Sequence, residues 1–412
     1  MRRIVITGIG TVTPLGNDIG TTWKGLTEER SGINYITKFD LTGLTSRIAG
    51  ELKNFSSENY ISRKDIQRLD PFIHYAVAAA IMAAEDAGLS VGANGRSPLL
   101  ENSGVIIGSS RGGITSMGNA LQKHLLNGKP FSAYLMSSST INMASSHISA
   151  KFGINGPALG ISTACASGTN AIGEAARMIR YGEIDLAFAG GSEAPLCRLA
   201  VGGYAASGAL SGRNQEPQKA SRPFDKDRDG FVISEGAGIL VLEELNHALK
   251  RGAKIYAELT GYGTSSDAFH QTKPDSEGEA LAINKALTDA KISAEEVDYI
   301  NAHATSTSLG DLAESIAIKK VFGKRADDIY VSSCKSMLGH MLGAAGAVEA
   351  AVTALSINRG IIIPTLNLET PDPACGLHHA TRTMKKEINT AITNSFGFGG
   401  VNAVLVLRKF RE

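Results

Sequence analysis

Residues 162–191 read STACASGTNAIGEAARMIRYGEIDLAFAGG. The first seven place a cysteine, Cys165, among small residues. The next part has the composition and spacing of a helix over Ile172–Tyr181, and the last is a short apolar run, Leu186–Ala189, that ends at two glycines. A helix followed by a short buried strand is the unit from which α/β folds are built.

The same alternation extends along the whole chain. Short apolar runs of strand type alternate with alanine-rich helical stretches. The runs are Ile4–Thr7, Val105–Ile107, Leu186–Ala189, Gly238–Leu242, Val297–Ile300 and Ala403–Leu407, and the helices include His74–Ala87, Ile172–Tyr181 and Gly343–Ile357. Runs that are apolar throughout are typical of sheets covered on both faces. The sequence therefore predicts an α/β protein with largely buried sheets.

A weak internal repeat divides the chain. Cys165 is followed by a helix containing Glu174-Ala175-Ala176, and the turn Lys335–His340 is followed by one containing Glu349-Ala350-Ala351. Such self-similarity indicates two copies of one structural unit. We predict two similar halves joined near residues 245–255, with residues 1–250 carrying the cysteine and residues 251–412 carrying two histidines.

Composition narrows the class of protein. Among 412 residues, 41 Lys+Arg and 40 Asp+Glu leave a net charge of +1, without the basic excess of a nucleic-acid-binding domain. The apolar runs are shorter than the roughly 20 residues of a membrane span. The first residues enter a strand pattern with no signal-peptide character, and the four cysteines form no close pairs that favour metal or disulfide sites. We expect a cytoplasmic protein with reduced thiols, without a membrane-spanning segment and without a metal site.

Cys165 has two interpretations. At the start of a helix, a thiolate is favoured by the positive end of the helix dipole, and free amides can stabilise an oxyanion. The alternative is a buried structural cysteine, which is the commoner role of a free thiol. The segment alone does not decide between them.

The C-terminal half adds three elements at strand ends. His303 follows the run Val297–Ile300, and His340 follows the segment Ile329–Ser333, five residues after Lys335. A glycine-rich segment, 394–402, contains Phe398 and offers exposed backbone amides. Loops at strand ends are where active sites are usually built, so a cysteine–histidine site becomes the favoured interpretation.

These residues resemble the β-ketoacyl-acyl-carrier-protein synthases, specifically the class with a Cys-His-His site. The resemblance covers nearly the whole chain. It rests on the segments Val5–Gly10, Ser221–Asp225, Gly230-Phe231 and Gly397–Gly400 together with the site motifs. Ala304 and Cys334 depart from it, where glycine and threonine are usual. The family implies a thiolase-like fold, in which two similar α/β halves form a five-layered α-β-α-β-α core, and a homodimer.

The resemblance also implies roles for individual residues. Cys165 would accept the acyl group, and His303 and His340 would serve decarboxylation. Lys335 would be the site lysine with Glu349 as its acidic partner, and Phe398 would gate the site and supply an oxyanion amide. Thr305 and Thr307 would contact the phosphopantetheine of an acyl carrier protein, whose acidic surface would meet Lys64 and Arg68, with Arg63 beside them and Lys123 and Lys129 as weaker candidates. No cofactor is implied.

The implied function is that of a 3-oxoacyl-acyl-carrier-protein synthase, an acyltransferase that condenses acyl-Cys165 with malonyl-carrier in fatty acid biosynthesis. A polyketide or aryl-polyene ketosynthase would share every reacting residue. A non-catalytic chain-length partner subunit is a further alternative, which retention of Cys165 disfavours. Chain length depends on the acyl tunnel, to which residues 108–114 and 136–143 are expected to contribute.

Overall fold

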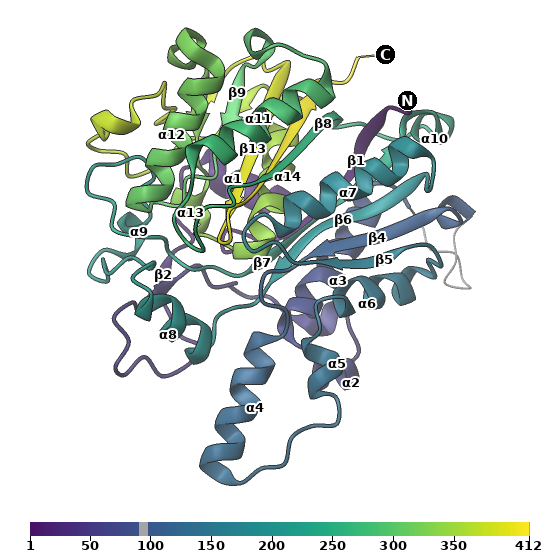
Figure 1. Ribbon diagram of the computed structural model, residues 1–412. Coiled ribbons are helices and arrows are strands. Elements are labelled where there is room, and N and C mark those ends of the chain that lie inside the picture. The colour runs from purple at the N-terminus through teal and green to yellow at the C-terminus, as the bar shows by residue number, and fades with distance from the viewer. Residues whose placement is uncertain (90–97, 412) are drawn as a thin grey trace.

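The computed structural model describes residues 1–89 and 98–411, and a long twisted sheet forms its centre (Figure 1). Within the described residues the sheet has ten strands in the order β10-β9-β13-β14-β8-β1-β7-β6-β4-β5. Their bounds are β1 Ile4–Val12, β4 Ser103–Gly108, β5 Ala158–Ile161, β6 Leu186–Glu193, β7 Gly236–Glu244, β8 Ala257–Ser266, β9 Tyr299–Asn301, β10 Tyr330–Ser332, β13 Thr390–Gly397 and β14 Val401–Arg408.

The sheet consists of two halves with the same topology. From the centre outward, one half runs β1-β7-β6-β4-β5 and the other β8-β14-β13-β9-β10. In each half the first two pairings are antiparallel and the last two are parallel. The halves meet where β1 pairs with β8, through Val5–Glu258 and Ile6–Ala257. The prediction of two similar halves is confirmed, whereas the division at residues 250 and 251 stays a prediction.

Helices cover both faces of each half and so give five layers. Helices α7 (Ser167–Tyr181) and α14 (Ala345–Arg359) lie between the two halves of the sheet and contact strands of both. The outer layers are α3 (Pro71–Asp86) with α6 (Met143–Phe152) on the N-terminal half, and α11 (Ser276–Ala290) with α12 (Ser308–Phe322) on the C-terminal half. Helix α14 is buried from Ala345 to Ile357 because, apart from Glu349, its residues there are apolar or small on every side.

A glycine allows the two central helices to approach closely. A Cβ on Gly168, in the first turn of α7, would lie 2.8 Å from the carbonyl oxygen of Gly343 and 3.1 Å from Ala347. Real side chains do not tolerate such contacts, so this position requires glycine. The contact holds the start of α7 against the segment that precedes α14, and both segments lead into the site described below.

The remaining described elements lie outside the ten-stranded sheet. Helix α4 (Ile114–Asn127) extends away from the body at the bottom of Figure 1, with α5 (Leu135–Ser139) beside it. The other helices are α1 Ile19–Thr27, α2 Arg63–Ile66, α8 Arg198–Ala206, α9 Pro217–Ala220, α10 Leu245–Lys250 and α13 Lys335–Leu338, and the short strands are β2 Asn34–Tyr35, β3 Ile48–Ala49, β11 Ile361–Ile362 and β12 Met384–Lys385. Within the described ranges, no helix is long and apolar enough to cross a membrane.

Candidate active site

Cys165 lies in a tight turn between β5 and the first turn of α7. Ala164 adopts φ = 50°, in the left-handed region that side chains rarely occupy. The amides of Ala166 and Ser167 bond back to the carbonyls of Thr163 and Ala164, which closes the turn. The small residues on either side of Cys165 leave room for this sharp turn. The cysteine is 9% exposed, and its sulfur faces the two histidines.

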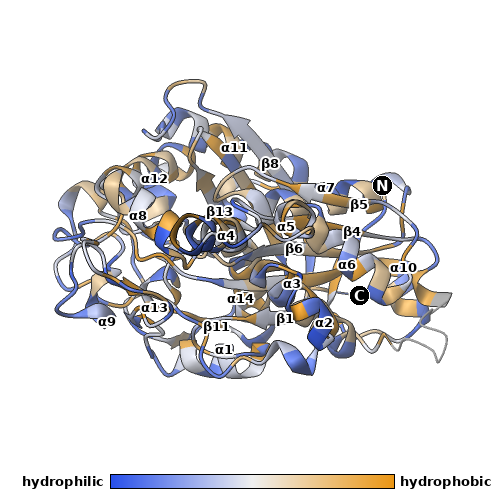
Figure 2. Cartoon of the chain, turned by 90° about the horizontal axis from the view of Figure 1, so that it is seen from below, coloured by the Kyte–Doolittle hydropathy of each residue, from blue (hydrophilic) through white to orange (hydrophobic). Residues whose placement is uncertain are grey.

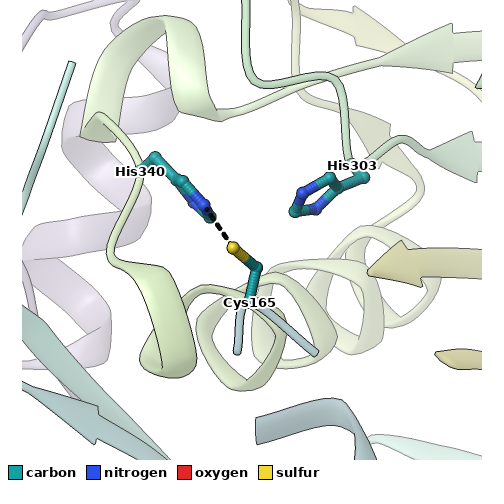
Figure 3. A group of neighbouring side chains, drawn as sticks. All are labelled: Cys165, His303 and His340. Atoms are coloured by element: carbon teal, nitrogen blue, oxygen red, sulfur yellow. Dashed lines mark hydrogen bonds between the residues drawn. The ribbon is translucent and has the colours of Figure 1, made fainter. Parts of the chain in front are cut away.

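The three predicted site residues converge from distant parts of the chain (Figure 3). Nε2 of His340 lies 3.1 Å from Sγ of Cys165. The ring centroids of His303 and His340 are 5.3 Å apart and the rings are nearly perpendicular, at 84°. The sulfur and one nitrogen of each ring all lie within 4.8 Å of one another. A single reacting group can thus contact all three side chains.

His303 is positioned by a carboxylate that the sequence patterns did not single out. Glu314, a buried residue of α12, accepts hydrogen bonds from the backbone amides of His303 (2.8 Å) and Ala304 (2.7 Å). The side-chain amide of Asn394 donates to the same carboxylate at 2.9 Å. The only sequence signal was an acidic residue inside an otherwise buried helix face. This carboxylate fixes the backbone that carries the imidazole.

Residues of the N-terminal half hold the backbone of His340 in place. Its amide donates to the carbonyl of Val232 at 2.7 Å, and its carbonyl accepts from Ser234 at 3.0 Å. The ring packs edge-on against Phe231, with centroids 5.2 Å apart. The segment Gly230-Phe231, which contributed to the family resemblance, therefore forms part of the site wall.

Lys335 and Glu349 form a buried ion pair beneath the histidines. Their side chains are 1% and 2% exposed and are hydrogen-bonded to each other. The predicted pairing is confirmed. Burial lowers the pKa of His303 well below its ordinary value, and the charge of Lys335 lowers it further. The same two causes, in the same order, lower the pKa of His340. Both imidazoles are consequently neutral near pH 7.

Cys165 differs from the expectation that a helix start favours its thiolate. Burial raises the pKa of Cys165 to about 11, although the charge of Lys335 and the backbone amide of Phe398 oppose that rise. Desolvation of the thiolate outweighs the favourable groups. The resting cysteine is a neutral thiol, so its reaction requires a base, and Nε2 of His340 is at hydrogen-bond distance.

We expect the alkylation of Cys165 by iodoacetamide to accelerate steeply with pH. Only the thiolate reacts, and with a pKa of about 11 the thiolate fraction grows roughly tenfold per pH unit between pH 7 and 10. Peptide mass spectrometry after timed exposure measures the rate at this residue. A rate that is already constant above pH 7 would mean that the thiolate is formed at rest.

Removing the charge of Lys335 should destabilise the fold. In Lys335→Met, Glu349 is left buried without its cation, a change that typically costs about 3–5 kcal/mol. The pKa of Glu349 is already raised by burial, and losing Lys335 raises it further, so the deficit relative to the wild type should grow as the pH rises above the folded-state pKa of Glu349 in the wild type. Urea unfolding at several pH values tests this. The double variant Lys335→Met/Glu349→Gln should recover part of the loss, and an equal loss in both would contradict the charge-based explanation.

The glycine-rich loop lies directly against the cysteine turn. A Cβ on Gly397 would be 3.1 Å from the amide nitrogen of Cys165 and 3.0 Å from the carbonyl oxygen of Thr163. Gly399 and Gly400 adopt φ of +88° and +68°, and the side chain of Phe398, which precedes them, is 38% exposed. The loop therefore brings the Phe398 amide to the sulfur and leaves its ring at the surface. Its roles as gate and oxyanion donor stay predictions.

A cavity of about 310 Å³ connects the three residues to solvent. Its lining includes Cys165, both histidines, Phe398 and the hydroxyl-bearing Thr305 and Thr307, which lie 3.2 Å apart. Thr307 also caps α12 by accepting from the Gly310 amide. The two threonines are thus placed along the route to the sulfur, as expected for contacts with a long thioester arm, although that contact stays a prediction.

The predicted carrier-binding residues lie elsewhere. Arg63 and Lys64 are exposed on α2, which is mostly hydrophilic in Figure 2, and Arg68 stacks on Tyr134 at 4.3 Å. The cavity lining contains none of these three, nor Lys123 or Lys129, but it does contain the exposed Lys273, which the sequence patterns did not single out. Lys273 and Arg111 are the lysine and arginine of the cavity lining, and the carrier-binding positions stay predictions.

One sulfur and two imidazoles form a donor set that can also ligate zinc. Metal-bound histidines normally hydrogen-bond through their second ring nitrogen, which fixes the ring. Nδ1 of His303 and Nδ1 of His340 are both buried without a partner among the described residues. Among the described residues, the two rings thus lack the second hydrogen bond that usually orients a metal ligand.

Residues 1–248 match the family model described as "Beta-ketoacyl synthase, N-terminal domain", and residues 256–369 match "Beta-ketoacyl synthase, C-terminal domain". The chain belongs to the beta-ketoacyl synthase family. A relative from Vibrio cholerae, 3-oxoacyl-(acyl-carrier-protein) synthase 2, is 45% identical over 414 residues and covers 99% of each chain. The resemblance stated from the motifs is confirmed.

Solved structures of the beta-ketoacyl synthase family share this architecture. A beta-ketoacyl synthase from Burkholderia phymatum superposes with a TM-score of 0.92 at 37% identity, over the whole of both chains. A type II polyketide ketosynthase, solved in complex with its acyl-carrier protein and bound to a hexaketide, gives a TM-score of 0.90 at 37% identity, over 99% and 100% of the chains. The predicted thiolase-like fold is confirmed.

Proposed function

We propose that this chain is a 3-oxoacyl-acyl-carrier-protein synthase, an acyltransferase that elongates an acyl chain held on Cys165 by decarboxylative condensation with malonyl-carrier. The observation that carries the proposal is the 3.1 Å contact between Sγ of Cys165 and Nε2 of His340, with His303 at the same cavity. The full-length relatives that carry this name support it.

The first half-reaction is acyl transfer. The thiol proton of Cys165 passes to Nε2 of His340 as sulfur attacks the carbonyl carbon of the acyl-carrier thioester. The bond between that carbon and the carrier sulfur breaks, and the proton leaves on the carrier thiol. A neutral His340 can accept this proton, which is the state that burial and Lys335 favour.

The second half-reaction forms the carbon–carbon bond. Malonyl-carrier loses CO2, and the released electron pair forms an enolate whose oxygen can accept hydrogen bonds from an N–H of His303 and from His340 in the tautomer that carries its proton on Nε2. The enolate carbon then attacks the acyl-Cys165 carbonyl, whose oxyanion is held by the amides of Cys165 and Phe398. The C–S bond breaks and sulfur takes a proton from solvent. These steps require no cofactor, and the phosphopantetheine belongs to the carrier.

A polyketide ketosynthase is the second candidate, favoured by the polyketide enzyme among the structural neighbours. Condensation assays with malonyl-carrier and a series of saturated acyl-carriers of increasing length distinguish the two. A fatty acid enzyme should condense several saturated lengths with one preferred range. Condensation of none of them would contradict the proposed function.

An acidic carrier protein is the proposed partner. Arg68→Glu should weaken carrier affinity about tenfold at low salt, because it replaces attraction with repulsion, and the difference should shrink at 0.5 M salt. Lys273→Glu, at the cavity lining, provides the comparison. Surface plasmon resonance at two salt concentrations measures both. Unaltered affinity in Arg68→Glu would remove α2 from the carrier surface.

We propose that a second copy of the chain covers α4 and the segment that follows it. Helix α4 and the segment after it expose large apolar side chains, with Leu125 and Leu126 each 72% exposed and Met136 69% exposed. Within the described residues, strand β5 forms an edge of the sheet and exposes Leu159. Such a patch favours burial in an interface. We propose a homodimer in the cytosol, where the four unpaired thiols would remain reduced.

A further inference from the structure

A positive charge lines the same cavity as the nucleophile. Arg111 follows β4 and faces the cavity together with Tyr204 of α8. Nε of Arg111 donates to the hydroxyl of Tyr204 at 2.8 Å. Tyr204 in turn packs edge-on against Phe231, with centroids 5.6 Å apart, and Phe231 packs against His340. A continuous wall of side chains thus leads from the reacting sulfur to a guanidinium.

The loop that carries this guanidinium is rigidly held. The buried carboxylate of Glu193 accepts from the amides of Ser110 (2.7 Å) and Arg111 (3.0 Å), and also from Gly343 at 3.1 Å. It therefore binds the Arg111 loop to the segment that precedes α14. The position of Arg111 is set by its backbone as well as by Tyr204.

Two donors remain available at this end of the cavity. In the described part of the chain, no carboxylate lies within ion-pair distance of Arg111, and its terminal nitrogens have no hydrogen-bond acceptor. Burial raises the pKa of Tyr204 to about 12, so the hydroxyl stays protonated and can donate while it accepts from Arg111. A hydrocarbon chain placed here would displace water from both groups without replacing their hydrogen bonds.

We infer that the acyl group held on Cys165 carries a hydrogen-bond-accepting oxygen towards its far end, with a carboxylate as the best fit, and that Arg111 and Tyr204 select it. This inference rests on the proposed function. A carboxylate accepts a charge-assisted, bidentate pair of bonds from a guanidinium, and the tyrosine hydroxyl offers a further bond. Acyl transfer itself is unchanged, because the far oxygen takes no part in bond making or breaking.

Three acyl-carriers of equal carbon number test the inference, namely hexanoyl, 6-hydroxyhexanoyl and adipoyl. The rate of Cys165 acylation is followed by intact-protein mass spectrometry at varied carrier concentration. We expect kcat/KM to be highest for adipoyl and lowest for hexanoyl. Arg111→Met should lower the adipoyl value at least tenfold and raise the hexanoyl value, because the guanidinium that an alkyl chain desolvates is gone, and Tyr204→Phe should show a smaller loss for adipoyl. The exposed Arg382→Met serves as the matched control and should change neither.

The outcomes separate the inference from the proposed function. Hexanoyl acylation and condensation that exceed those of adipoyl would overturn the inference and leave the function intact. An equal loss for both chains in Arg111→Met would also overturn it, since that pattern indicates a structural role. Failure of all three chains to acylate Cys165 would overturn both.

Discussion

Cys165→Gln is expected to lower condensation by about four orders of magnitude or more, because the acyl group then has no covalent holder. Glutamine lacks a nucleophile but leaves His303, His340 and their supporting residues in place. Malonyl-carrier should therefore still lose CO2 at a measurable rate. Condensation is followed by product mass spectrometry, and decarboxylation by release of labelled CO2.

Cys375→Ala is the matched control for this variant. Cys375 is also a buried free thiol, but it lies outside the cavity lining. Its removal should leave condensation within about twofold. If Cys165→Gln retained condensation, or if Cys375→Ala lost it equally, Cys165 would not be the acyl holder.

His303→Ala has the second-largest expected effect, a fall in decarboxylation of about 10²–10³-fold. The change removes one of two donors to the enolate oxygen, a loss comparable to removing an oxyanion donor. Acylation of Cys165 should persist, because Nε2 of His340 contacts the sulfur directly. His303 packs against the His340 ring and acts on the enolate in the later step. The two half-reactions are measured separately, by labelled CO2 release and by the mass of the acylated protein.

A histidine away from the cavity provides the comparison. His378 is half-buried near Tyr330, with ring centroids 4.2 Å apart, and is absent from the cavity lining. His378→Ala should change neither half-reaction. An unaltered decarboxylation rate in His303→Ala would remove His303 from that step, and an equal loss of acylation would indicate that the variant disturbs the whole site.

The architecture was predictable from the sequence because buried strands and alanine-rich helices leave strong periodic signals. The repeat whose two copies begin at Cys165 and at Lys335 predicted two similar halves. The topology of the sheet repeats in the same way. The convergence of Cys165, His303 and His340 was also predictable, since each follows a strand or precedes a helix in the order that the family motifs require.

Several features depend on tertiary contacts that leave little trace in a single sequence. Glu314 reaches the His303 backbone across 11 positions and Glu193 reaches the Arg111 loop across 82, so no local pattern exposes them. The raised pKa of Cys165 was not predictable because a helix start is visible in the sequence whereas the burial of the thiol is not. The projecting helix α4 had no clear signal, because the apolar residues that it exposes look like those of a buried helix.

Covalent capture tests the central claim most directly. The protein is mixed with acyl-carrier in the absence of malonyl-carrier, and the intact protein and its peptides are weighed. We predict one acyl group per chain, located on the peptide that contains Cys165 and discharged when malonyl-carrier is added. No adduct, or an adduct on another cysteine, would contradict the account.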